Sequence, residues 1–581
     1  MGVKKRKLLT PFEIFVIPLG LVLCSLVAAR LGSAYSAIQN LGLKGEEFYV
    51  SIFKEISSNP LSFTFDDNVI GMLIFTFSLY AVITFYYYTN KKNLMPGEEH
   101  GSAQWAGKHE ADLISSEKEE ENIILTETER MSLDTRKTRK NLNVMVIGGS
   151  GSGKTRFFVK PNLMQHNTSY VVTDPKGELL KSTAPMLEAN GYKIKVFNLI
   201  DMAHSSAYNP FAYIKDDKDV MKMINILIKN TTPSTARSGD PFWEKSETAL
   251  LQALCYYLYY EAPYEEQNFS MVMELLRSAE VRESDESYES DLDLLFNHLK
   301  EKNPDHIALK QYSIFKQAAG QTAKSILVSV GVRMASFNTR NIAALTITDN
   351  IRLEELGLEK TALFVVVPDS HDTFNFLVAM MYSQIFDSLY YLADNDYGGR
   401  LPVHVRFLLD EFANIGQIPE FDKMVATMRS REISVSIILQ NLAQIKANYK
   451  ETWESITGNC DSLLFLGGQE QSTLEYISKR LGKATIDLRT TGESHGKSKS
   501  NSVNFGLHGR ELLTPDEISR MSDQNCILMV RGLKPFFSNK FDIKRHKEYS
   551  KLNDTDTGSG FVYSGIDTPF DVLDDFFREY A

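Results

Sequence analysis

The feature that most constrains the fold is a glycine-rich run directly after a short apolar strand. Residues 143–147 suit a buried strand, the run after them matches G-x-x-x-x-G-K-[ST], and a helix-compatible stretch follows. Glycines let successive backbone N–H groups turn inward, and the next helix adds its positive end, so the loop is a cradle for phosphates. Its residues are Gly148, Gly149, Ser150, Gly151, Ser152, Gly153, Lys154 and Thr155.

This loop predicts ATP and Mg²⁺ as cofactors. We expect Lys154 to reach the β- and γ-phosphates and Thr155 to ligate Mg²⁺. The alternative, a glycine-rich turn without a ligand, does not explain the strand before it and the helix after it.

Further short apolar runs predict the rest of a sheet. Their largely continuous hydrophobicity is typical of parallel strands buried on both faces. The sequence therefore indicates an α/β fold with a mostly parallel sheet. The runs are residues 170–173, 194–197, 362–367, 403–409, 435–439, 462–466 and 527–530.

One of these strands, 403–409, delivers two adjacent carboxylates at its carboxyl end, where such sheets bind ligands. We expect Asp410 to hold Mg²⁺ through water and Glu411 to orient and deprotonate an attacking water. Asp174 follows a neighbouring strand. It either lies near nucleotide or Mg²⁺ or stabilises the turn that Pro175 and Gly177 mark.

The domain boundaries follow from composition. The nucleotide-binding domain spans 141–214 and 341–550, and the long insertion 215–340 lacks β-branched runs, which predicts an all-α subdomain. Residues 93–140 are expected to be a linker. Within the predicted all-α subdomain, residues 282–305 are expected to form a solvated acidic surface. Residues 490–504 are expected to form a polar surface loop. The tail 551–581 is acidic and aromatic, and either folds on a basic partner or stays solvated.

Two apolar runs precede the soluble part and predict an anchor over 1–92. The runs, about 8–29 and 69–88, approach or reach the length that crosses a bilayer. Basic residues at 4–7 and 91–92 place both ends in the cytoplasm. A cleaved signal peptide over residues 1 to about 30 is the alternative, and it leaves the later topology unchanged.

The charge limits how the chain meets nucleic acid. Its 581 residues carry a net charge of −11, which argues against a non-specific nucleic-acid coat, so any such contact is local. The four cysteines are too far apart to chelate a metal and are expected to be reduced.

Several motifs, in their order along the chain, resemble one family: the type IV secretion coupling ATPases of bacterial conjugation. The likeness covers nearly the whole chain. Its motifs are HGSAQWA at 100–106, DPKGE at 174–178, YNP at 208–210, DPFWEKSE at 240–247 and LLDEFANIG at 408–416.

The resemblance implies a RecA-like P-loop domain, a homo-hexamer in the bacterial cell membrane, and a soluble part in the cytoplasm. It also implies partners: a relaxase in its relaxosome, single-stranded DNA and the components of a type IV secretion channel. By the same likeness, Arg429 is expected to act as an arginine finger on a neighbouring subunit's ATP, with Arg431 as the alternative, and Gln440 to sense the γ-phosphate.

Two other functions fit the same core. A chromosome-segregating DNA translocase usually has more membrane spans and a terminal winged-helix module, and neither is found in the sequence. A membrane docking receptor would use ATP only as an assembly switch. Stimulation of hydrolysis by single-stranded DNA separates the motor from the receptor.

Overall fold

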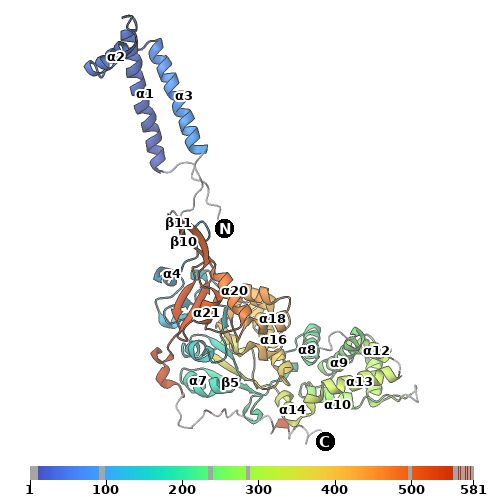
Figure 1. Cartoon of the computed structure of the whole chain (residues 1–581). Helices are drawn as coiled ribbons and strands as arrows, with labels where there is room; N and C mark the ends of the chain where they lie inside the picture. The colour runs from blue at the N-terminus through green and yellow to red at the C-terminus, as the bar shows by residue number, and fades with distance from the viewer. Residues whose placement is uncertain are drawn as a thin grey trace. The chain divides into compact units, whose positions relative to one another are not determined.

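The protein is described here from a computed structural model of the whole chain. The described residues are 11–89, 98–232, 240–282, 288–318, 320–494, 500–553, 561, 563, 570, 572, 573 and 576. The chain divides into two compact units, Met1–Glu99 and His100–Ala581 (Figure 1).

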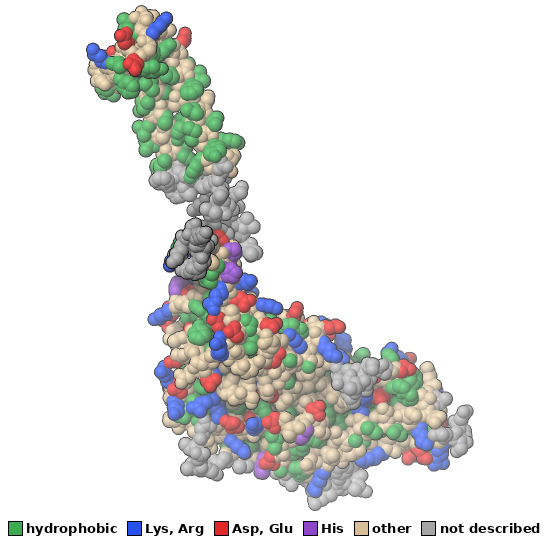
Figure 2. Space-filling view, in the orientation of Figure 1, with side chains coloured by type: hydrophobic (Ala, Val, Ile, Leu, Met, Phe, Trp, Pro, Cys, Tyr) green, Lys and Arg blue, Asp and Glu red, His purple; other side chains and the backbone are tan. Residues whose placement is uncertain are grey.

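The first unit is a bundle of three helices, α1 (Pro11–Gln39), α2 (Glu46–Ser58) and α3 (Asp67–Thr89). α1 packs along α3, and the Tyr80 hydroxyl donates a hydrogen bond of 2.7 Å to the Ile17 carbonyl. Apolar side chains cover the outside of both helices (Figure 2). Two segments, Phe15–Gln39 and Asp67–Tyr87, are long and apolar enough to cross a membrane.

The first helix is longer than the predicted span, which ended at residue 29. It continues through Arg30, whose side chain is buried and whose guanidinium donates a hydrogen bond of 2.7 Å to the Glu55 carbonyl in α2. The basic residues 4–7, 91 and 92, used for the predicted orientation, lie outside the described residues.

In the described part of the second unit, nine strands form one sheet in the order β13-β12-β9-β3-β8-β7-β4-β6-β5. All neighbours from β9 to β5 pair in parallel, so the predicted α/β fold is confirmed. The predicted strand at 527–530 runs antiparallel to both neighbours, because a short turn joins it to the edge strand β13. The strands are β3 (Val144–Ile147), β4 (Ser169–Asp174), β5 (Lys193–Asn198), β6 (Thr361–Val366), β7 (Val405–Leu409), β8 (Ile433–Leu439), β9 (Ser462–Phe465), β12 (Asn525–Val530) and β13 (Phe536–Asn539).

The central strands bury both faces, as their continuous hydrophobicity predicts. In β3, Met145 and Ile147 join one hydrophobic core, whereas Val144 and Val146 join the other. Successive side chains of a strand point to opposite faces, so such a strand must be covered by helices on both sides. The covering elements are α6 (Lys160–Met164), α7 (Glu178–Ala189), α15 (Glu355–Leu358), α16 (Asn375–Tyr391), α17 (Phe421–Thr427), α18 (Leu442–Asn448), α19 (Trp453–Gly458), α20 (Gln471–Leu481) and α21 (Pro515–Ser519).

Helices are the regular elements in the described residues of the inserted segment, and the last of them, α14, extends past the predicted boundary at residue 340. Its α8 packs against α16 of the sheet domain, and a buried ion pair of 2.6 Å joins Glu247 to Arg333 inside it. The acidic stretch 282–305 is not wholly solvated, since Asp293 is buried and accepts a hydrogen bond of 2.8 Å from the Tyr312 hydroxyl. The helices are α8 (Asp217–Thr231), α9 (Pro241–Glu261), α10 (Phe269–Arg277), α11 (Asp291–Lys302), α12 (Ile307–Lys316), α13 (Gly320–Arg333) and α14 (Arg340–Ile347).

Two segments differ from the sequence-based expectations. The supposed linker 93–140 is folded from α4 (Lys108–Asp112) through β1 (Asn122–Ile124) and β2 (Arg130–Ser132) to α5 (Thr135–Thr138), and Ile123 and Met131 are buried in the sheet's core. The supposed loop 490–504 lies largely in a long hairpin of β10 (Lys483–Ser494) and β11 (Ser500–Glu511).

The described residues of the tail pack against this chain itself. Leu573 is buried beside Ala344 and Ile347 of α14, and the Arg340 guanidinium lies 5.9 Å from the centre of the Phe570 ring. These described residues of the tail thus cover part of α14.

Candidate functional site

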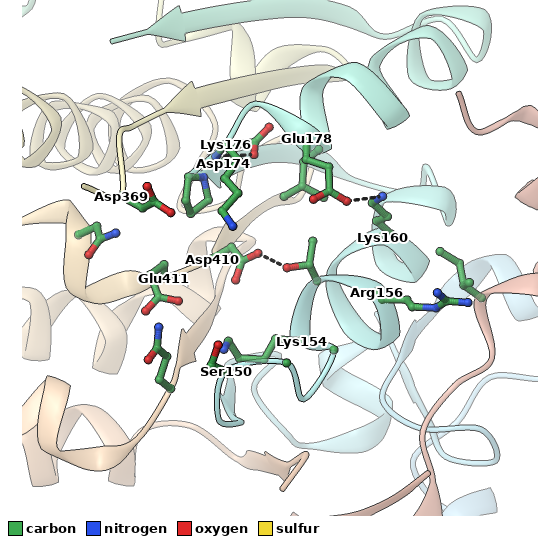
Figure 3. A pocket seen from close by; sticks show the side chains of 18 of the residues that line it. Ser150, Lys154, Arg156, Lys160, Asp174, Lys176, Glu178, Asp369, Asp410 and Glu411 are labelled. Carbon is green, nitrogen blue, oxygen red and sulfur yellow. Dashed lines mark hydrogen bonds and ion pairs between the residues drawn. The ribbon is translucent and has the colours of Figure 1, made fainter. Parts of the chain in front are cut away.

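A cavity of about 850 Å³ lies at the carboxyl ends of the parallel strands, where the phosphate loop follows β3 and Asp410 follows β7 (Figure 3). Most of the predicted site residues converge there. Those that line the cavity are Ser150, Gly151, Gly153, Lys154, Thr155, Asp410, Glu411 and Gln440.

The phosphate loop is held by its neighbours in the sheet. The N–H of Gly148 donates to the Leu439 carbonyl at 3.0 Å, and the N–H of Gly149 donates to the Gly467 carbonyl at 2.8 Å. Gly153 has a φ of +82°, and a Cβ there would lie 2.4 Å from the Phe157 ring. Only glycine fits this position, so the sequence requirement for glycine has a direct steric cause.

The positions of Lys154 and Thr155 suit an anionic ligand, which the Lys154 ammonium would bind, and a divalent cation, which the Thr155 hydroxyl would bind. The Lys154 ammonium is buried, 9% exposed, and donates a hydrogen bond of 2.9 Å to the Gly148 carbonyl of its own loop. The Thr155 hydroxyl donates a hydrogen bond of 2.7 Å to an Asp410 carboxylate oxygen. A hydroxyl and a carboxylate at this distance are the oxygen ligands that Mg²⁺ takes beside phosphates.

The Asp410 carboxylate is buried, and burial disfavours its charged form. It is 5% exposed, and burial raises its pKa to about 6. The neighbouring carboxylates of Glu411 and Asp174 act in the same direction, against the Thr155 hydrogen bond and the Lys154 charge. A bound cation would stabilise its charged form. Among the described residues there is no group of three His, Cys, Asp or Glu side chains that could hold a metal ion.

Glu411 is held by a chain of hydrogen bonds that the sequence did not predict. Its backbone is left-handed, with φ +56°, and its carboxylate accepts a hydrogen bond of 3.1 Å from the Gln444 amide. The Gln444 carbonyl in turn accepts one of 2.8 Å from the backbone N–H of Gln440. Gln444 connects the end of β8 to Glu411, and the only signal for it was its i+4 spacing from Gln440.

Asp174 lies at the cavity and beside the turn, the two places that its two sequence-based interpretations require. It lines the cavity, and it accepts a hydrogen bond of 2.8 Å from the Leu180 N–H beyond the turn. Burial raises the pKa of its carboxyl.

A second lysine reaches the phosphate loop from the edge of the sheet. Lys540, directly after β13, is buried and donates a hydrogen bond of 2.9 Å to the Ser152 carbonyl. Burial lowers the pKa of this amine. No motif marks Lys540, nor Ile543 and Tyr549, which add an apolar part to the cavity wall.

The two candidate arginine fingers are not among the residues that line the cavity of their own chain. The Arg429 guanidinium donates a hydrogen bond of 2.7 Å to the Thr135 carbonyl. Arg431 pairs with Asp394 at 2.8 Å and lies 4.4 Å from the centre of the Tyr390 ring.

This sheet and this loop define a protein with a RecA-like P-loop core. The chain belongs to the family described as "Type IV secretory system Conjugative DNA transfer", whose sequence model matches residues 104–549. The predicted family is therefore confirmed.

Individual relatives agree with that assignment. The chain is 21% identical over 559 residues to the protein VirD4 of Rhizobium radiobacter, covering 93% of this chain and 77% of VirD4. It is 24% identical over 488 residues to the conjugal transfer protein TraG of Escherichia coli, covering 78% and 75%.

Solved structures of the plasmid coupling protein TrwB share the fold. TrwB in complex with the non-hydrolysable ATP analogue ADPNP has a TM-score of 0.56 at 14% identity, covering 77% of this chain and 95% of TrwB. TrwB in complex with ADP and Mg²⁺ has a TM-score of 0.54 at 14% identity, covering 76% and 92%.

Proposed function

We propose that this protein is a membrane-anchored ATP hydrolase that couples a relaxosome to a type IV secretion channel and drives conjugative DNA transfer. The observation that carries the hydrolase is the contact of Thr155 with buried Asp410, beside Lys154 and Glu411 in one cavity. Family membership supports the role in DNA transfer.

The residues of the cavity have separate roles in binding ATP, holding Mg²⁺ and activating water. The inward N–H groups of 148–155 and the Lys154 ammonium bind the phosphates of ATP, and Thr155 with Asp410 holds Mg²⁺. Bound Mg²⁺ neutralises phosphate charge. Glu411 orients a water and takes its proton, while Gln444 fixes the carboxylate that does so. Gln440 stands at the end of β8 and relays the state of the γ-phosphate to Glu411 through Gln444.

The anchor and the assembly complete the proposal. The helices α1 and α3 cross the cell membrane, and the second unit lies in the bacterial cytoplasm. The protein works as a homo-hexamer on single-stranded DNA with its relaxase. Arg429 completes the ATP site of a neighbouring subunit. The name of TrwB, a conjugative coupling protein solved with an ATP analogue, supports this role by analogy.

The test is hydrolysis by the full-length protein in detergent, with and without single-stranded DNA. A coupling motor hydrolyses ATP faster when DNA is added, whereas a docking receptor that uses ATP as a switch does not respond. Lys154→Ala should abolish both hydrolysis and plasmid transfer while membrane insertion persists, because Lys154 contacts the loop and packs no core. Transfer at the wild-type frequency by this variant would contradict the proposal.

A further inference from the structure

The hairpin of β10 and β11 exposes large apolar side chains. The two strands pair from Lys483 with Glu511 to Ser494 with Ser500. Several exposed apolar side chains gathered on one element outside the candidate membrane spans mark an interaction site. The exposed fractions are 78% for Phe505, 48% for Leu488, 43% for Leu507, 43% for Val503 and 37% for Ile486.

Both faces of the hairpin carry such residues. Leu488 lies opposite Gly506 on one face, and Phe505 lies opposite Arg489 on the other, with the guanidinium 5.9 Å from the centre of the ring. In the described residues the hairpin forms a two-stranded sheet of its own. An isolated hairpin is at best marginally stable in water, so something else must cover this one.

The base of the hairpin is fastened to the chain that enters the second unit. The Ala103 N–H donates to the Lys483 carbonyl at 2.9 Å, and the Thr485 N–H donates to the Gly101 carbonyl at 3.1 Å. A Cβ at Gly101 would lie 2.2 Å from the Lys483 carbonyl oxygen, so this close approach requires glycine.

Chain length then limits what can cover the hairpin. α3 ends at Thr89, and the chain from there to His100 spans at most about 40 Å even when fully extended. The 12-residue strands of the hairpin are themselves about 40 Å long. With α3 in a bilayer, the hairpin is therefore long enough, and tethered closely enough, to reach the lipid surface.

We propose that the β10–β11 hairpin binds the surface of an anionic membrane, with Val503, Phe505 and Leu507, which share one face, in the headgroup region. This inference rests on the membrane anchor of the proposed function. The bases Lys483 and Arg489 on the described strands suit acidic lipid headgroups, whereas Arg510 pairs with Glu517, and an aromatic ring beside an arginine suits the interface.

The experiment uses full-length protein in vesicles of phosphatidylethanolamine and phosphatidylglycerol. An environment-sensitive fluorophore is attached at Phe505→Cys in a Cys24→Ser background, since Cys255, Cys460 and Cys526 are buried. The matched control carries the label at Tyr264→Cys, which is 64% exposed on the helical insertion. We expect spin-labelled lipid to quench position 505 at least about twofold more than position 264.

Flotation of the same vesicles reports the anchor separately. Equal quenching at both positions in floating protein overturns the hairpin's membrane contact but leaves the anchor standing. Cross-linking of position 505 to a second copy, without lipid quenching, also overturns it and assigns the hairpin to a neighbouring subunit. Protein that fails to float overturns the anchor and this inference together. Phe505→Ser should keep its ATPase rate in detergent, which shows that the variant is folded.

Discussion

Lys540 places a second ammonium group, besides that of Lys154, against the phosphate loop, and no sequence motif marks this residue. It is buried without a carboxylate partner among the described contacts, and its hydrogen bond to the Ser152 carbonyl fixes the middle of the loop. Burying a charged lysine side chain costs free energy unless polar or charged partners compensate it. Its hydrogen bond to the Ser152 carbonyl predicts that it holds the loop in the shape that binds phosphate.

Lys540→Met should therefore weaken ATP binding about tenfold, since a hydrogen bond from a charged group contributes about 1.5 to 3 kcal/mol. The measurement is titration of the full-length protein with a fluorescent ATP analogue. Lys540→Arg is the matched control and should retain most of the affinity. An unchanged affinity with a lower melting temperature would make Lys540 purely structural.

Glu411 and Gln444 give a second prediction at this scale. Glu411→Gln should still bind ATP and Mg²⁺, because Asp410 remains, but hydrolyse at least about 10²-fold more slowly since the base is lost. Gln444→Leu removes the hydrogen bond that orients Glu411 and should lower kcat less, without changing nucleotide affinity. A nearly normal rate for Glu411→Gln would leave the carboxylate a structural role.

At the scale of the element, β7 and the residue before it place two basic side chains beneath the carboxylates that follow the strand: buried Arg406, and His404, whose side chain is 12% exposed. Arg406 donates a hydrogen bond of 2.9 Å to the Asn162 side chain of α6, which belongs to the helical segment after the phosphate loop. His404, just before the strand, bonds to Glu432 at 3.0 Å and to Ser434 at 2.8 Å. Burial, together with Arg406 and Arg400, lowers the pKa of His404 to about 3.

The pH dependence of stability follows from that shift. The unfolded chain binds a proton at His404 near pH 6.5, whereas the folded chain does not until about pH 3. The stability is therefore complete above pH 6.5 and is lost as the pH falls, by up to about 1.4 kcal/mol per pH unit. Thermal unfolding at pH 7.5 and pH 5 should show a smaller drop for His404→Gln than for wild type. Equal drops would contradict this account.

Sequence patterns predicted those strands and loops whose formation depends on residues close together in the chain. β3 with its loop and β7 with Asp410 follow from continuous hydrophobic runs and a motif a few residues long. The β10–β11 hairpin was missed because its Ser, Gly and Lys content is typical of a loop, while its stability depends on pairing across the turn. Lys540 and Gln444 were missed because their roles depend on where β13 ends and where α18 begins in the folded chain. No local pattern encodes these positions.

At the scale of the whole molecule, the candidate fingers suggest a site shared between subunits. Arg429 donates to the Thr135 carbonyl of its own chain, and it is not among the residues lining its own cavity, which otherwise has its phosphate loop, base and metal ligands. A guanidinium stabilises the charge that develops on a transferred phosphoryl group. The proposed role of Arg429, acting from one subunit on the ATP of the next, is therefore a prediction for the assembled ring.

Mixed rings test this directly. Lys154→Ala subunits keep Arg429 but lose the phosphate loop, and Arg429→Ala subunits keep the loop but lose the finger. Each variant alone should be nearly inactive, and mixing them should restore part of the hydrolysis at interfaces where an intact loop meets an intact finger. Hydrolysis is measured in rings shown by affinity tags to contain both variants. Recovery with Arg431→Ala subunits as partners, and none with Arg429→Ala, would move the role to Arg431. Its bonds to Asp394 within its own chain make that outcome less expected.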